Sequence, residues 1–268
     1  MLTRVISAVV AAVLVIAVTM IFKTTGAYAI CSVAVLGCIF EFSRLTLKKA
    51  EATFLVQISF MTLAALTYVV TVARPDLCGY VAALSAIVMM SMLVLDVRRE
   101  PDLGQAFKVA SACLVGLFYV GLFPGLTIAL LGLEQGLTVF FGLLGIVFAG
   151  DTFAYFFGRF LGKNKLLESV SPKKTIEGSI GGLLGSAIVG FCLAHFFLTE
   201  LPVAQLVVIA VVSGAFGQVG DLFESLLKRL ADVKDSGRIM PGHGGFLDRL
   251  DGVLFAAPVY YVLLHFLT

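Results

Sequence analysis

Nine long apolar segments limit what this chain can fold into. They contain no Asp, Glu, Lys or Arg, and they cover residues 5–22, 24–40, 52–73, 77–95, 109–133, 135–150, 178–199, 201–220 and 252–268. Since about 20 helical residues cross a hydrocarbon core about 30 Å thick, each segment is close to one membrane span in length. Their apolar residues are continuous rather than alternating, which argues against a transmembrane β-barrel. The sequence therefore predicts an all-α, polytopic integral membrane protein with about nine transmembrane helices.

The composition agrees with this class. The chain is 60% hydrophobic and only 13% charged, whereas soluble globular proteins are about 25% charged. Its net charge of +2 is too small to indicate a nucleic-acid partner. We expect the lipid bilayer to surround this protein, and we expect no nucleic acid among its partners.

The basic residues predict how the chain is oriented in the membrane. Of the 19 Lys and Arg residues, all but Lys23 and Arg74 lie in the amino terminus or in the connections after the second, fourth, sixth and eighth segments. Basic residues accumulate on the cytoplasmic side of membrane proteins, so the amino terminus and these connections are expected to be cytoplasmic. Pro124 lies inside the fifth segment, where it would kink or break a helix and change the span count by one.

Polar residues are distributed unevenly between the two halves of the chain. Residues 1–133 contain no carboxylate inside a predicted span and no dense motif, so we interpret them as helices for packing and anchoring. Residues 134–268 contain clustered acids, bases, hydroxyls and glycines. The second half is therefore expected to hold the chemistry.

Two features of the second half suggest polar sites near the membrane surface. Asp151 is flanked by apolar residues, and a carboxylate at that depth costs about 2.5–3.5 kcal/mol unless it faces a polar cavity or a partner. Tyr155, four residues later, is the alternative local partner.

Further on, residues 171–175 (Ser-Pro-Lys-Lys-Thr) place hydroxyls and ammonium groups just before a helix start, where phosphate binds readily. Lys163 and Lys165 in the same connection need do no more than set topology.

The eighth segment ends in an amphipathic pattern. Four polar residues follow helical spacing and share one helix face. They are two acids, a hydroxyl and a cation: Asp221, Glu224, Ser225 and Lys228. A cytoplasmic helix extension stabilised by ion pairs would explain this pattern alone. The glycine-rich, basic segment that follows favours a functional site.

That following segment combines a glycine turn with paired carboxylates. Residues 234–245 include Lys234, Asp235, His243 and glycines at 242, 244 and 245, and glycine lets backbone N–H groups approach an anion closely. Asp248 and Asp251 are three residues apart at the predicted start of the last helix, which places both on one face. Carboxylates with phosphate oxygens suit Mg²⁺, although two acids in a first turn also complement the helix dipole.

These motifs resemble the signature of phosphatidate cytidylyltransferases, also called CDP-diacylglycerol synthases. The matching positions are Ser225-x-Leu227-Lys228-Arg229, Lys234-Asp235-x-Gly237 and Pro241-x-His243-Gly244-Gly245-x-x-Asp248-Arg249-x-Asp251. Upstream, Asp151 to Gly158, Ser171-Pro172 and Lys174-Thr175-x-Glu177-Gly178 are similar to the family's other motif. The chain departs from the common pattern at Lys173, Ile176 and Met240.

The resemblance implies a helical membrane enzyme that condenses phosphatidate with CTP to give CDP-diacylglycerol and pyrophosphate. It further implies Mg²⁺ held by Asp221, Asp248 and Asp251, with Lys228 as a fourth catalytic residue. The implied substrate-binding residues are Ser171, Lys174, Thr175, Ser225, Arg229, Lys234, Asp235, His243, Gly244, Gly245 and Arg249. The active site is expected on the cytoplasmic side of the cell's inner (plasma) membrane.

Two other functions are compatible with parts of the pattern. A CTP-dependent lipid kinase of the polyprenol type would share the nucleotide, metal and lipid, and a secondary transporter would use Asp151 as an intramembrane polar site. The dense signature at 225–251 disfavours the kinase, and transport does not explain the basic, glycine-rich cluster. Small residues of the seventh segment allow close packing within one chain or between two copies. Both a monomer and a homo-oligomer are therefore compatible with the sequence.

Overall fold

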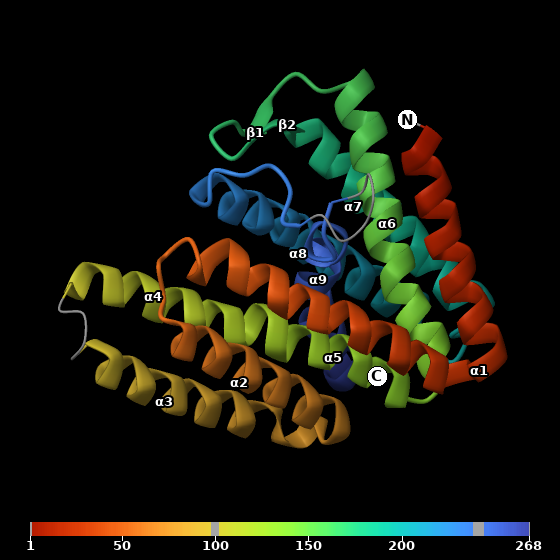
Figure 1. Cartoon of the computed structure of the whole chain (residues 1–268). Coiled ribbons are helices and arrows are strands. Elements are labelled where there is room, and N and C mark those ends of the chain that lie inside the picture. The colour runs from red at the N-terminus through yellow and green to blue at the C-terminus, as the bar shows by residue number, and fades with distance from the viewer. Residues whose placement is uncertain (1, 98–101, 238–243, 268) are drawn as a thin grey trace. The chain divides into compact units, whose positions relative to one another are not determined.

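The computed structural model describes residues 2–97, 102–237 and 244–267. It divides into two compact units, Met1–Ala129 with Leu230–Arg249, and Leu130–Arg229 with Leu250–Thr268. In the described residues the regular structure is helical apart from one small β-hairpin (Figure 1).

The first unit consists mainly of helices α1 to α5. They are α1 (Leu2–Phe42), the π-helical turn η1 (Ser43–Leu47), α2 (Phe54–Ala73), η2 (Pro75–Leu77), α3 (Cys78–Val97), α4 (Leu103–Gly116), η3 (Leu117–Leu122) and α5 (Phe123–Ala129). The aromatic rings of Phe42, Phe60 and Tyr119 are buried together, with centroids 5.7 and 6.1 Å from that of Phe42. Figure 1 shows α2 beside α3 and the α4–α5 run, so this core joins helices distant in sequence.

Two backbone irregularities occur where the sequence indicates them. Lys23 has φ 51° and ψ −134° inside α1, so a kink separates the predicted segments 5–22 and 24–40. Pro124 is the second residue of α5, which begins directly after the π-helical turn η3. Since proline cannot donate a backbone hydrogen bond, the wider π turn accommodates it, and the apolar run from Leu103 to Gly132 continues as one candidate span.

The second unit carries the rest of the helices and the hairpin. Its elements are η4 (Leu130–Gly132), α6 (Gly136–Phe160), β1 (Lys165–Leu167), β2 (Ser171–Thr175), α7 (Ile176–Phe196), α8 (Val203–Leu230) and most of α9 (Leu247–Leu267). The strands pair antiparallel, with Lys165 opposite Thr175. Leu143, Ile146, Ile209 and Tyr260 are fully buried in its apolar core.

Helices α6 and α7 approach each other backbone to backbone. A Cβ atom placed on Gly185 would lie 2.8 Å from the carbonyl oxygen of Ala149, and one on Gly182 would lie 3.0 Å from that of Gly150. Glycine removes the side chain that would separate the two helices, as it often does in membranes. This packing brings the end of α6 beside the start of α7.

The predicted fold class is confirmed. Within the described residues, eight helices are long and apolar enough to cross a membrane, and the structure is an all-α polytopic fold. The hairpin in the connection between α6 and α7 was not predicted. The functional division into residues 1–133 and 134–268 stays a prediction, while the compact units place residues 230–249 with the amino-terminal helices.

Candidate active site

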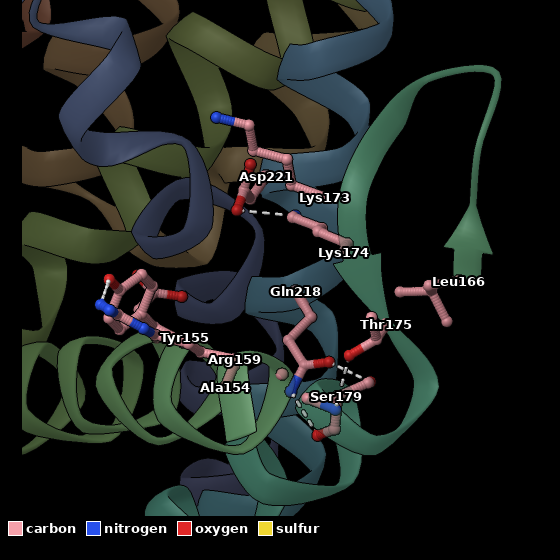
Figure 2. Close-up of a pocket in the computed structure, with 13 residues that line it drawn as sticks. Ala154, Tyr155, Arg159, Leu166, Lys173, Lys174, Thr175, Ser179, Gln218 and Asp221 are labelled. Atoms are coloured by element: carbon pink, nitrogen blue, oxygen red, sulfur yellow. Dashed lines mark hydrogen bonds and ion pairs between the residues drawn. The ribbon is translucent and has the colours of Figure 1, made fainter. Parts of the chain in front are cut away.

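A cavity of about 460 Å³ lies in the second unit, where α6, α7, α8 and the hairpin meet. Figure 2 shows residues that line it. From α6 come Asp151, Ala154, Tyr155, Gly158 and Arg159; from the hairpin Leu166, Lys173, Lys174 and Thr175; and from α7 and α8 Gly178, Ser179, Gln218 and Asp221. The cavity therefore offers cationic, anionic and amide groups beside apolar side chains.

An ion pair crosses this cavity. Lys174 Nζ lies 2.6 Å from Asp221 Oδ2, and the two side chains are 26% and 36% exposed. Strand β2 carries Lys174 and helix α8 carries Asp221 (Figure 2). The structure thus joins the upstream Ser-Pro-Lys-Lys-Thr motif to Asp221, which is 47 residues after Lys174 and four residues before the signature begins at Ser225.

Three carboxylates interact electrostatically in the same unit. Asp251 is close enough to Asp221 and Asp151 to be repelled by both and is attracted by Lys228, while Asp151 is attracted by Lys174. Like charges grouped in this way are stabilised by a bound cation or nearby ammonium groups. Among the described residues, however, no three Asp, Glu, His or Cys side chains converge in metal-binding geometry.

Asp248 has a different environment in the first unit. Its Oδ2 atom accepts hydrogen bonds from the backbone N–H of Ser236 at 2.9 Å, the hydroxyl of Ser236 at 2.8 Å and the backbone N–H of Gly245 at 2.8 Å. Gly244 has φ 83°, and a Cβ there would lie 2.6 Å from Asp248 Oδ2. Asp248 therefore holds the loop before α9, and glycine at 244 is required by both conformation and space.

The remaining signature residues of α8 organise their surroundings. Lys228 pairs with Glu224, which is fully buried. The hydroxyl of Ser225 is 3.5 Å from Asp221 Oδ1. Arg229 Nε donates to the carbonyl oxygen of Val170 at 3.3 Å, which ties the end of α8 to the tip of the hairpin.

The structure places the other predicted residues outside the carboxylate group. Thr175 caps α7 by accepting from the backbone N–H of Gly178 at 3.1 Å. Ser171 begins β2, Lys234 and Asp235 are exposed, Gly245 donates to Asp248, and Arg249 lies in the first turn of α9. His243 lies outside the described residues.

Sequence reasoning missed two polar residues in the cavity. Gln218 Nε2 donates to the carbonyl oxygen of Ser179 at 3.0 Å, and the hydroxyl of Ser179 donates to Gln218 Oε1. A glutamine inside an apolar span was the available signal, because polar residues at that depth need partners. Tyr155, weighed as a partner of Asp151, instead accepts a hydrogen bond from Arg159 at 2.9 Å.

Fold and site together define a multi-pass helical membrane protein with clustered acids and bases suited to binding phosphates. A family model described as the cytidylyltransferase family matches residues 2–267. The phosphatidate cytidylyltransferase of Staphylococcus haemolyticus (strain JCSC1435) is 40% identical over 181 residues, which are 68% of this chain and 69% of the relative. That of Staphylococcus aureus (strain COL) is 41% identical over 184 residues, 69% of this chain and 70% of the relative. The chain belongs to the cytidylyltransferase family, and it is a nucleotidyltransferase.

Proposed function

We propose that this chain is a phosphatidate cytidylyltransferase, which condenses CTP with phosphatidate to give CDP-diacylglycerol and pyrophosphate. The relatives that carry this name match about two thirds of the chain. The observation that carries the site assignment is the cavity in which Lys174 and Asp221 meet beside Asp151. Such a site brings cations for phosphate next to carboxylates for a divalent ion.

The reaction mainly requires that negative charges be brought together. A phosphate oxygen of phosphatidate attacks the α-phosphorus of CTP and pyrophosphate leaves roughly in line. The nucleophile is already anionic, so no strong general base is needed. The protein's task is to bind and neutralise the phosphates. For this we propose Lys174, Lys228 and Arg229. We add Lys234, which precedes α9, and Arg249 in the first turn of that helix.

We also propose that Asp221 and Asp251 hold Mg²⁺, with Asp248 as a third contributor. The mutual repulsion of Asp151, Asp221 and Asp251 fits a cation site, and carboxylate oxygens are the ligands that Mg²⁺ prefers. Its contribution when bound would be to neutralise charge on the triphosphate and on the leaving pyrophosphate. The hydrogen bonds to Asp248 Oδ2 would meanwhile keep the loop before α9 in shape.

The site is proposed to face the cytoplasm at the cell's inner (plasma) membrane. The connections that carry Lys174 and Arg229 are among those predicted to be cytoplasmic, because these connections and the amino terminus contain nearly all the basic residues of the chain. CTP would arrive from water, while the acyl chains of phosphatidate stay in the bilayer. Association of two copies stays a prediction.

Parallel assays with α-labelled and γ-labelled CTP test the proposal. Purified protein is incubated with phosphatidate, Mg²⁺ and either label, and the lipid and water phases are separated. We expect the α-label in the lipid and the γ-label in released pyrophosphate. The γ-label in the lipid without the α-label would indicate a CTP-dependent lipid kinase and would overturn the assignment.

A further inference from the structure

A buried carboxylate at the end of α1 lies outside the known signature. Glu41 is only 2% exposed and is the next-to-last residue of α1. A buried carboxylate is costly unless its oxygens are hydrogen-bonded, and the helix continues past Glu41 through the π-helical turn η1, so no free helix end is available to it. Glu41 must therefore be stabilised by groups from elsewhere in the first unit.

These groups come from the loop before α9 and from the first residue of that helix. Glu41 Oε1 accepts the backbone N–H of Phe246 at 3.2 Å, and Oε2 accepts that of Leu247 at 3.0 Å. The hydroxyl of Ser236 lies 3.2 Å from the same Oε2. The first N–H groups of a helix have no partner within it, so Glu41 caps α9 from about 205 residues away in the sequence.

Two glycines of the loop pack directly on this carboxylate. A Cβ atom on Gly237 would collide with Glu41 Oε1, and a Cβ on Gly245 would collide with Glu41 Oε2 and with the hydroxyl of Ser236. Every hydrogen bond described for the Glu41 carboxylate comes from residues 236–247. The described residues on both sides of 238–243 therefore pack around Glu41, and Glu41 and Asp248 share the hydroxyl of Ser236 between them.

We propose that Glu41 is a positioning residue for cytidylyl transfer. Its carboxylate fixes the start of α9, and α9 carries Asp248, Arg249 and Asp251 within its first turns. An apolar residue would fill a buried position at lower cost than an acid, so the acid serves the geometry of the loop rather than the packing of α1. This inference rests on the proposed function, and it gives the amino-terminal helices a part in the reaction.

The test compares Glu41→Gln, Glu41→Ala and Gly245→Ala with the exposed control Glu134→Gln. Each protein is purified in detergent, and rates are expressed per folded molecule. Glu41→Gln keeps the size of the side chain but gives one amide nitrogen where an acceptor is needed. We expect its kcat to fall at least about tenfold, equivalent to about 1.4 kcal/mol, with little change in KM for CTP, while Glu134→Gln behaves as wild type.

A double-mutant cycle tests the contact itself. Gly245→Ala disturbs the same contact from the loop side, so the double variant Glu41→Ala/Gly245→Ala should lose much less activity than the product of the two single losses. Multiplicative losses would contradict a shared role. If Glu41→Ala does not fold, the cycle is run with Glu41→Gln.

A fluorescent reporter separates this inference from the proposed function. The chain has no tryptophan, so Val233→Trp places a single indole in the exposed part of the loop. We expect Glu41→Gln to increase its quenching by acrylamide, even if the wild type forms no CDP-diacylglycerol. Folded Glu41→Gln with wild-type kcat and unchanged quenching would overturn the inference.

Discussion

Lys174 is the residue that most directly links the hairpin to the acidic groups of α8. Its ammonium group pairs with Asp221 at 2.6 Å, whereas Lys163 is exposed before the hairpin. We expect Lys174→Ala to lower kcat/KM at least about tenfold, because a charge-assisted contact with a phosphate is worth about 1.5–3 kcal/mol. Lys163→Ala should be nearly silent. Steady-state kinetics of both variants measure this, and the opposite order would place the phosphate site at the other end of the connection.

The carboxylates of α9 permit a second prediction at the residue scale. Asp248→Asn and Asp251→Asn keep the side-chain volume but remove a charge, so each should lower kcat about a hundredfold or more, or about 2.7–4 kcal/mol. Chelation of divalent ions should abolish turnover of the wild type. The exposed Glu200→Gln serves as the control, and full activity in both Asp variants would remove the metal assignment.

Sequence reasoning found residues whose spacing is local, and it missed partners that lie far apart in the chain. The helical spacing of Asp221 and Ser225 predicts a shared face, and their side chains do approach each other. Nothing in that spacing shows that Asp248 binds Ser236 or that Glu41 caps α9. Such contacts depend on how helices pack, which a single sequence does not encode in a short motif.

At the scale of elements, the contact between α6 and α7 is sensitive to added volume. A Cβ on Gly185 would lie 2.8 Å from the carbonyl oxygen of Ala149 and 2.9 Å from Phe153 Cβ, so Gly185→Ala must push the helices apart. Overpacking of this kind costs about 1–3 kcal/mol, and we expect a lower unfolding temperature in detergent. Gly79→Ala meets no atom within 4 Å and should unfold no earlier than wild type.

The elements themselves were largely predictable because apolar runs determine membrane helices. The sequence also predicts that the sixth helix extends past its apolar run 135–150 to include Asp151, and α6 continues to Phe160. The hairpin escaped prediction because its strands are three and five residues long. Strands that short carry too few residues for a period of two to be recognised.

At the scale of the whole molecule, the distribution of basic residues predicts which connections are cytoplasmic. Single cysteines at Lys173 and Glu200, which belong to connections on opposite predicted sides, distinguish the two orientations in intact cells. A membrane-impermeant thiol reagent should label Glu200→Cys without permeabilisation and Lys173→Cys only after it. The parent protein, with five native cysteines, gives the background, and the reverse pattern would contradict the proposed cytoplasmic site.

The family and the all-α class were predictable from one sequence. The signature contains enough matching residues to indicate the family, and the apolar segments are long enough to indicate membrane helices. What could not be predicted is that the loop before α9 belongs with the first unit rather than with the helices next to it in sequence. That assignment depends on contacts such as those of Glu41 with Phe246 and Leu247.

The hairpin has a practical consequence for protein engineering. Glu177 accepts hydrogen bonds from the backbone of Lys163 and Asn164 at its base, and Lys165 Nζ donates to the carbonyl oxygen of Pro172 across it. These bonds hold the base, while Arg229 separately contacts Val170 near the tip, where Glu168 and Ser169 are exposed. A short epitope or a fluorophore-binding peptide grafted between Glu168 and Ser169 should therefore leave Lys174 in register, giving a handle for capturing the enzyme from membranes in working form.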